Sequence, residues 1–137
     1  DLALTAPDGA VVKPSDFAGQ KLVLFFYPKD DTPGCTTENL DFSALSGDFA
    51  KAGTALLGIS KDPPARHQKF IAKHALTAPL ASDAADGGLS DALGFWGDMG
   101  MIRSTVLVDA EGRIARVWSP VKVKGHAAEV LEAARSL

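Results

Sequence analysis

The stretch Tyr27-Pro28-Lys29-Asp30-Asp31-Thr32-Pro33-Gly34-Cys35-Thr36-Thr37-Glu38 contains the only cysteine of this 137-residue chain. The six residues at positions 22–27 are apolar without interruption, which is typical of a strand buried on both faces. Pro28 ends that strand. From Cys35 onward, apolar residues recur at helical spacing as far as position 52, and Gly53 follows as a helix stop. The stretch therefore predicts a strand-to-helix junction, with a helix over residues 35–52 that carries sulfur in its first turn.

The same patterns predict further elements on both sides of this junction. Upstream we expect a small hairpin of residues 2–6 and 11–13, followed by one helical turn at 15–19. Downstream we expect a strand at 55–60, a helix from the Asp62-Pro63-Pro64 start to about residue 74, a short strand within 76–82, a short helix near 89–93, a hairpin of 104–109 with 113–118, and a helix over 125–137. This order predicts an α/β protein, a mixed sheet covered by helices that resembles the thioredoxin-like fold.

Composition limits the classes of function. The length and the 46% hydrophobic content suit one globular domain over residues 1–137. A net charge of -3 and a pI near 5.5 argue against nucleic acid as a partner. The longest apolar run is far shorter than the roughly 20 residues of a membrane helix, so no membrane span is expected. A single cysteine excludes an intramolecular disulfide and favours a reducing compartment, the cytoplasm.

The position of Cys35 allows two interpretations of its sulfur. Unpaired backbone N–H groups give the start of a helix a partial positive charge, which stabilises a thiolate over a thiol. On a helical wheel Cys35 lies about 20° from Phe42, so it should point toward the body of the protein in a semi-buried pocket. An inert buried cysteine is the common alternative, since free cysteine is among the most buried residue types. Its place directly after Thr-Pro-Gly favours the reactive interpretation.

The pattern Pro28-x-x-x-Thr32-x-x-Cys35, within residues 26–38, resembles the peroxidatic motif of peroxiredoxins of the AhpC/TSA family. The most similar group is the bacterioferritin-comigratory, or Q-type, group. The resemblance extends over nearly the whole chain, through Ser15-Asp16-Phe17-x-Gly19, Gly58-Ile59-Ser60 with Asp62, Arg103-Ser104-Thr105 and Val123-x-Gly125-His126-Ala127. It implies a thioredoxin-like fold with a central mixed β-sheet covered by helices and an N-terminal β-hairpin.

The resemblance also implies roles for residues of the motif itself. Cys35 would attack a peroxide as a thiolate and become a sulfenic acid. The Thr32 hydroxyl would hydrogen-bond both the thiolate and the incoming peroxide, although Thr32 is otherwise an ordinary turn residue. Pro28 would exclude water from the pocket, in addition to ending the strand.

Three further residues complete the implied site. Arg103 matches the active-site arginine of the family, whose charge would stabilise the thiolate and polarise the peroxide oxygens, whereas a surface position is the default for an arginine. Backbone N–H groups of Gly34 and Cys35 would donate to the bound peroxide. Glu38 would support the site, or would simply favour the positive end of the helix.

The chain departs from the family pattern at two places. Q-type relatives often carry a resolving cysteine five residues after the peroxidatic one, where this chain has Leu40, which lies about 160° from Phe42 on the wheel and should project away from the core. With one cysteine, the sulfenic acid would be reduced by an external thiol, such as thioredoxin, glutaredoxin or glutathione, or would pair with Cys35 of another molecule. The segment between Trp96 and Met101 is also shorter than usual, which would alter the pocket near Arg103.

Other polar residues fit structural roles. His67, His74 and His126 lack the neighbours of a metal site, and His67 and His74 are expected on a solvated helix face. Asp30 and Asp31 are expected to be solvated loop charges. Neither a metal nor another cofactor is implied.

The sequence therefore favours a one-cysteine thiol peroxidase that reduces hydrogen peroxide and organic hydroperoxides, as a monomer or weak homodimer. A thioredoxin-like disulfide exchanger is a second possibility, because Thr32-Pro33-Gly34-Cys35 resembles a C-x-x-C loop without its first cysteine. A third possibility is a non-enzymatic redox sensor or chaperone-like binding protein that is switched by oxidation of Cys35.

Overall fold

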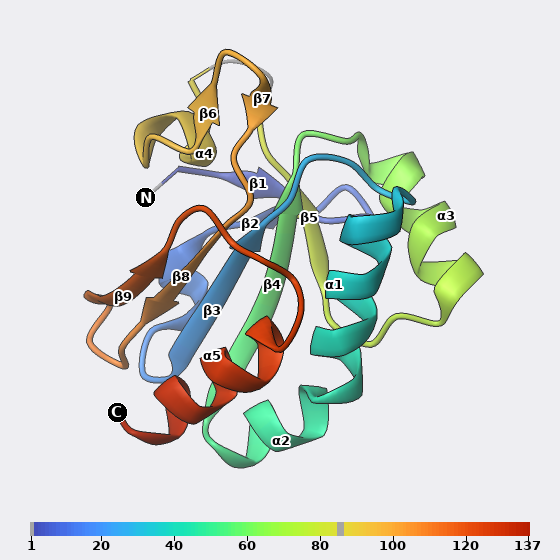
Figure 1. The fold of residues 1–137 in the computed structure, drawn as a ribbon. Coiled ribbons are helices and arrows are strands. Elements are labelled where there is room, and N and C mark those ends of the chain that lie inside the picture. The colour runs from blue at the N-terminus through green and yellow to red at the C-terminus, as the bar shows by residue number, and fades with distance from the viewer. Residues whose placement is uncertain (1, 85–86) are drawn as a thin grey trace.

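The structure, a computed structural model, describes residues 2–84 and 87–137. Its main sheet has seven strands in the order β2-β1-β5-β4-β3-β8-β9 (Figure 1). The bounds are β1 Leu4–Thr5, β2 Val11–Val12, β3 Lys21–Phe26, β4 Thr54–Ser60, β5 Leu80–Ser82, β8 Ser104–Val108 and β9 Ile114–Trp118. Strands β3, β4 and β5 are parallel to one another. Strand β8 pairs antiparallel with β3, and β9 pairs antiparallel with β8. The predicted thioredoxin-like mixed sheet is confirmed, and β1 and β2 form the predicted N-terminal hairpin.

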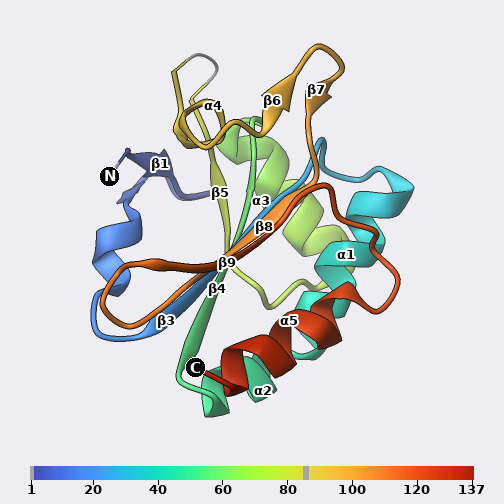
Figure 2. The same ribbon diagram turned by 60° about the vertical axis from the view of Figure 1, so that its left-hand side comes forward.

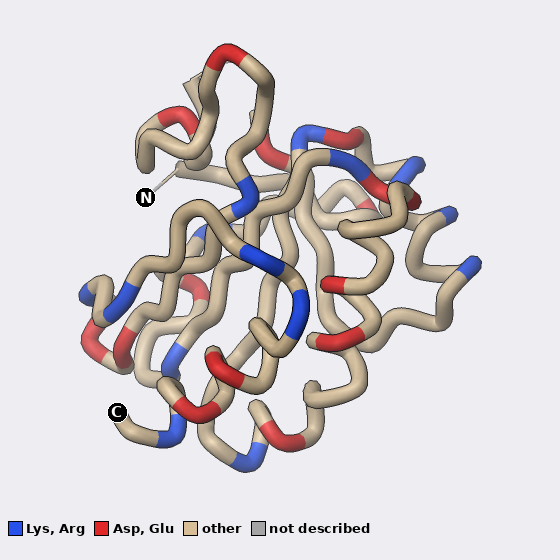
Figure 3. The backbone as a smooth tube through the Cα atoms, viewed as in Figure 1, with Lys and Arg blue, Asp and Glu red and all other residues tan. Residues whose placement is uncertain are grey.

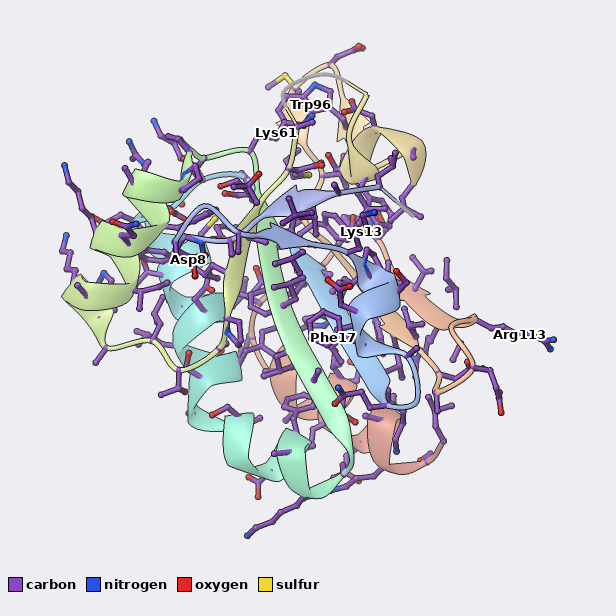
Figure 4. The ribbon with its side chains drawn as sticks, turned by 180° about the vertical axis from the view of Figure 1, so that it is seen from behind. Asp8, Lys13, Phe17, Lys61, Trp96 and Arg113 are labelled. Atoms are coloured by element: carbon purple, nitrogen blue, oxygen red, sulfur yellow. The ribbon has the colours of Figure 1, made fainter. Side chains whose placement is uncertain are left out.

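Helices cover both faces of the sheet, as Figure 2 shows with the sheet turned toward its edge. On one face lie α1 Pro33–Ala44, α2 Ser46–Lys51, α3 Pro64–His74 and α5 His126–Arg135, and on the other lie the 3-10 helix η1 Pro14–Phe17 and α4 Leu89–Ala92. Figure 4, seen from behind, shows Phe17 of η1 over the second face of the sheet. The helical turn expected at 15–19 is present one residue earlier and shorter, and the helix expected near 89–93 is present and ends one residue earlier.

Strand β3 contributes to two hydrophobic cores. Side chains on a strand alternate between its faces, so Val23 and Phe25 pack under α1 and α5, while Leu24 and Phe26 pack on the opposite side. Residues 22–27 are all buried, because β3 lies between β4 and β8 and is covered on both faces. The interpretation of this apolar run as a central strand is therefore confirmed, and the strand fixes the start of the loop that leads to Cys35.

The single helix expected over residues 35–52 is wrong in two respects. It begins at Pro33, whose missing N–H costs nothing in a first helical turn. It also divides at Leu45 into α1 and α2. The carbonyl of Ser43 accepts hydrogen bonds from the hydroxyls of Ser46, at 2.8 Å, and of Thr77, at 2.9 Å. These side-chain bonds replace regular helix bonds at the division.

The region after β5 forms a small subdomain at one end of the sheet. Asp83 accepts hydrogen bonds from the backbone N–H groups of Leu89, at 2.8 Å, and Ser90, at 2.9 Å, and so holds the start of α4. Two short strands, β6 Trp96–Gly97 and β7 Gly100–Met101, form a hairpin whose tip carries the fully exposed Met99. The Lys61 ammonium lies 4.8 Å from the centre of the Trp96 ring, and Figure 4 shows the pair at the edge of this subdomain.

The strand expected within residues 76–82 is shorter in the structure, since β5 begins only after Pro79. The Pro79 carbonyl accepts a hydrogen bond from the Gly58 backbone, so the chain joins the sheet here although proline has no N–H to donate. Residues 85 and 86, in the Asp-rich and Gly-rich stretch of the sequence, lie outside the described residues. Over the described ranges, none of the helices combines the length and the apolar character that crossing a membrane requires.

Candidate active site

Cys35 is the third residue of α1, and its side chain lies in the core with only 1% of its surface exposed. It packs in the same cluster as Tyr27 and Phe42, which confirms the inward orientation expected from the helical wheel. Leu40 lies on the outer side of α1 and is 42% exposed, as the wheel also predicts. The backbone carbonyl of Cys35 accepts a hydrogen bond of 3.0 Å from the amide of Asn39.

Arg103 lies 68 positions after Cys35 in the sequence, and its side chain contacts the Cys35 sulfur. Its Nη2 donates to the Cys35 sulfur at 3.2 Å, and its Nη1 donates to Glu38 Oε1 at 2.5 Å. Arg103 lies directly before β8, and its carbonyl accepts a hydrogen bond of 2.9 Å from the backbone of Val121. The strand pairing of β3 with β8 thus brings the arginine to the start of α1, where one guanidinium bridges the sulfur and a carboxylate.

The bridge places two ionisable groups in a poorly solvated setting. Burial raises the pKa of Glu38 to about 7, although the charge and hydrogen bond of Arg103 act in the opposite direction. Glu38 is 1% exposed, and its Oε2 has no hydrogen-bond partner among the described residues. Burial alone would lower the Arg103 pKa, but the charges of Glu38 and Cys35 raise the pKa above its ordinary value. The guanidinium therefore remains a permanent positive charge beside the sulfur.

Gly34 allows the guanidinium to approach the helix closely. A Cβ atom at this position would lie 3.2 Å from Arg103 Nη2, closer than most carbon atoms tolerate. Gly34 and Cys35 belong to the first turn of α1, where backbone N–H groups have no partner within the helix. These N–H groups and the arginine together form a setting that suits an oxygen with partial negative charge.

Thr32 and Pro28 lie in the loop between β3 and α1. Thr32 precedes the helix as its cap residue, and its hydroxyl donates to the Lys29 carbonyl at 2.9 Å. This bond occupies the hydroxyl proton and leaves the oxygen lone pairs available as acceptors. Pro28 is exposed on the loop, so its exclusion of water stays a prediction.

The expected solvation of His67 and Asp30 is wrong, because both side chains are completely buried. His67 Nδ1 lies 2.6 Å from Asp30 Oδ2, and Tyr27 donates to Asp30 Oδ1 at 2.6 Å. The sequence did contain a signal for His67, since it precedes the core residue Phe70 by three positions and so shares its side of α3. Asp31, in contrast, is exposed as expected.

Two further histidines occupy different settings. His74 is partly buried, and its Nε2 lies 3.0 Å from Asp31 Oδ1. His126 is buried beside Phe42 with its Nε2 2.8 Å from Thr105 Oγ1, and burial lowers the pKa of His126. In the part of the chain that the structure describes, no three side chains of His, Cys, Asp or Glu gather as they would around a metal ion.

Comparison with known proteins identifies the family of this chain. Residues 1–117 match the AhpC/TSA family. Peroxiredoxin Bcp of Xanthomonas campestris is 43% identical over 99% of this chain and 89% of its own length. Peroxiredoxin Bcp of Bacillus subtilis is 41% identical over 100% of this chain and 92% of its own. A solved structure of the X. campestris bacterioferritin comigratory protein, described with its alkyl peroxide reduction activity, has a TM-score of 0.94 at 42% identity, covering 99% of this chain and 91% of that chain.

Proposed function

Because this chain belongs to the AhpC/TSA family of peroxiredoxins and is a thiol peroxidase, we propose that Cys35 is the sulfur that reduces the peroxide. The observation that carries this assignment is the Arg103 guanidinium, 3.2 Å from the sulfur and paired with Glu38. A fixed positive charge favours the thiolate, which is the nucleophilic form of cysteine. The hydrogen bond from Arg103 to Glu38 orients the guanidinium before the substrate arrives.

The proposed reaction transfers one oxygen atom to the sulfur. The Cys35 thiolate attacks the terminal peroxide oxygen, a sulfur–oxygen bond forms, and the O–O bond breaks to give a sulfenic acid. The other oxygen leaves with the electron pair of the O–O bond and takes up a proton, as water or an alcohol. Arg103 and the N–H groups of Gly34 and Cys35 stabilise the negative charge that shifts between the two oxygens.

Thr32 and Pro28 have supporting roles in this proposal. Thr32 accepts a hydrogen bond from the peroxide O–H through its free lone pairs, while it donates to Lys29. Pro28 limits the approach of water from the loop side. Glu38 acts through Arg103, since the described contact of its carboxylate is with that guanidinium.

We further propose a one-cysteine cycle, because Leu40 stands where Q-type relatives often have a resolving cysteine. A thiol condenses with the sulfenic acid to give a mixed disulfide and water, and a second thiol releases Cys35. Thioredoxin, glutaredoxin and glutathione are the candidate reductants. The alternative is a disulfide between Cys35 residues of two copies. The proposed setting is the reducing cytoplasm, with the chain as a monomer or weak homodimer.

The substrates proposed are hydrogen peroxide and organic hydroperoxides. The X. campestris relative is described with alkyl peroxide reduction activity, which supports the second class. The polar groups beside Cys35 suit the two oxygen atoms of a hydroperoxide, which both classes of substrate share.

Stopped-flow consumption of hydrogen peroxide and of an alkyl hydroperoxide, with a dithiol as reductant, tests the proposal. Rapid turnover that disappears in Cys35→Ser is the expected result, and turnover that survives this change would overturn it. Mass spectrometry of the oxidised chain should show either one added oxygen or a reducible doubled mass. A slow reaction with a stable, oxidation-dependent complex would instead indicate the non-enzymatic sensor or chaperone-like protein.

A further inference from the structure

We propose that His67 is a positioning residue that holds the catalytic loop, residues 28–32, in the conformation that keeps Cys35 beside Arg103. The inference rests on the proposed function of Cys35. The relevant cluster joins Tyr27 at the end of β3, Asp30 in the loop and His67 on α3, each with 0% of its surface exposed. The Ala81 carbonyl, on β5, completes it.

The hydrogen bonds of this cluster can be assigned from the chemistry of the atoms. The Ala81 oxygen can only accept, so His67 Nε2, at 3.1 Å, must carry a proton and donate. The 2.6 Å contact between His67 Nδ1 and Asp30 Oδ2 then holds one further proton between the two groups. Tyr27 donates to Asp30 Oδ1, also at 2.6 Å. Both oxygens of the buried carboxyl group are therefore bonded, and His67 connects it to β5.

Polar contacts also fix the backbone around Asp30. Its N–H donates to Asp62 Oδ2 at 2.8 Å. The next residue, Asp31, has a positive φ of 63° and binds Lys73 of α3 at 2.8 Å. In Figure 3, acidic positions of the loop before α1 lie near basic positions of α3. On the outside, a cleft of about 470 Å³ lies between the loop and α3, lined by Asp31, Pro63 and Phe70 among others. The loop thus depends largely on polar contacts for its position.

Three residues separate Asp30 from Gly34, the neighbour of Cys35, so a displacement of Asp30 moves the start of α1. If His67 no longer bonds the Asp30 carboxyl group, a buried polar group is left with one hydrogen-bond partner fewer. Such a group is strongly unfavourable in the interior. The least costly relaxation brings Asp30 and its loop toward solvent. That movement would expose the Cys35 sulfur and lengthen its contact with Arg103, so the pair acts as a latch on the reactive cysteine.

Two substitutions of His67 separate the latch from simple destabilisation. The amide nitrogen of asparagine occupies nearly the place of Nδ1, so His67→Asn keeps a donor for Asp30 and loses the bond to Ala81. The amide of glutamine reaches nearly the place of Nε2, so His67→Gln keeps the bond to Ala81 and loses the bond to Asp30. Each variant loses one buried hydrogen bond, so both melting temperatures should fall, and the rates are compared at a temperature at which both variants are fully folded.

The measurements are the peroxide kcat/KM and the rate at which a bulky maleimide alkylates Cys35. We expect His67→Gln to lower kcat/KM about tenfold or more and to raise the alkylation rate by a similar factor, since small misplacements in a reactive site have large kinetic effects. His67→Asn should stay within about threefold of the wild-type rates by the same principle. Loss of activity that follows melting temperature equally in both variants would show a merely structural role and overturn the proposal.

Further variants keep the test decisive. Tyr27→Phe removes only the hydroxyl that donates to Asp30 and should raise alkylation in the same direction, by a smaller factor. Should His67→Gln fail to fold, an alkylation rate in Tyr27→Phe equal to that of the wild type would refute the latch. Ser90→Ala is the matched control, because it removes a buried hydrogen bond to the carboxylate of Asp83 on the other face of the sheet. It should lower stability without changing the alkylation of Cys35.

The alkylation assay needs no peroxide, so the two proposals can fail separately. Absence of peroxide turnover in the wild type, combined with faster alkylation in His67→Gln, would refute the proposed function and support the latch. Normal turnover with equal alkylation in the wild type and in His67→Gln would refute the latch alone.

Discussion

Arg103 and Cys35, 68 positions apart in the sequence, are joined by a contact of 3.2 Å between Nη2 and the sulfur. The same guanidinium donates to Glu38 through Nη1, so its orientation is fixed from the helix itself. Both contacts require a planar group with several N–H donors, which arginine has and lysine lacks.

Replacing Arg103 with lysine should therefore lower peroxide reduction although the charge is kept. A lysine ammonium can approach the sulfur or Glu38, but it cannot bridge them with the same geometry. We expect kcat/KM to fall by about 10²-fold, a value typical for the loss of one oriented electrostatic contact. Stopped-flow kinetics would measure it, with Arg113→Lys on the exposed β8–β9 turn as the control. A wild-type rate in Arg103→Lys would show that charge alone is sufficient.

Glu38 should make the stability of the protein depend on pH in an unusual direction. Its pKa in the folded state is about 7, above the ordinary 4.5. Between these values the folded state retains a proton that the unfolded state has lost, so this group contributes less stability as the pH rises through the window. At 1.36 kcal/mol per unit of pKa, the change amounts to roughly 3 kcal/mol.

Glu38→Gln removes this titration. Relative to the wild type, the variant should gain roughly 3 kcal/mol in the free energy of unfolding between pH 4.5 and pH 7.5, by the same linkage. Urea unfolding at the two pH values gives the comparison. Glu132→Gln, on the exposed side of α5, should show no such pH-dependent difference. Parallel stability curves for the wild type and Glu38→Gln would contradict the raised pKa.

Gly34→Ala should reduce activity with little effect on stability. The new Cβ would lie 3.2 Å from Arg103 Nη2 and would push the guanidinium from its place over the sulfur. We expect kcat/KM to fall by roughly fivefold to tenfold, since misplacement rather than loss of the charge is involved. Gly47→Ala in α2 is the matched control, because nothing lies within 4 Å of its Cβ position. Equal activities in both variants would mean that the guanidinium adapts without cost.

Leu40→Cys should supply the missing resolving thiol. Residues five apart in a helix have Cα atoms about 9 Å apart, which is too far for a disulfide. Oxidation of this variant should therefore unwind the start of α1 and produce a disulfide between Cys35 and the introduced thiol. Mass spectrometry would show the loss of two hydrogen atoms in place of a gained oxygen, and circular dichroism would show a reversible loss of helix. A sulfenic acid that persists in the variant would indicate that α1 does not open.

Local sequence patterns were sufficient for the junction at Cys35. The apolar run of β3, Pro28 and the helical spacing that follows are all contained within residues 22–52, and they correctly place the sulfur on the inward side of α1. The contact with Arg103 depends on the pairing of Phe26 with Ser104, which no local pattern specifies. Only the resemblance to peroxiredoxins indicated this arginine.

Long-range polar contacts also explain the errors. At the division between α1 and α2, the Ser43 carbonyl accepts a hydrogen bond from Thr77, which lies more than thirty positions further along the chain. The burial of Asp30 depends on His67, 37 positions away on α3. In each case a polar residue has a specific partner far away in the sequence, and such partners are visible only in three dimensions.

The hairpin of β6 and β7 has a consequence for how oxidation of this protein must be measured. Met99 at its tip is entirely exposed, whereas Cys35 is 1% exposed. The sulfur most open to an oxidant in solution is therefore not the one assigned to turnover, and selectivity must come from chemical activation rather than from access. A methionine sulfoxide adds the same single oxygen as a sulfenic acid, but thiols do not reverse it. A persistent added oxygen after treatment with a dithiol would thus report damage at the hairpin tip, and Met99→Leu would separate it from catalysis.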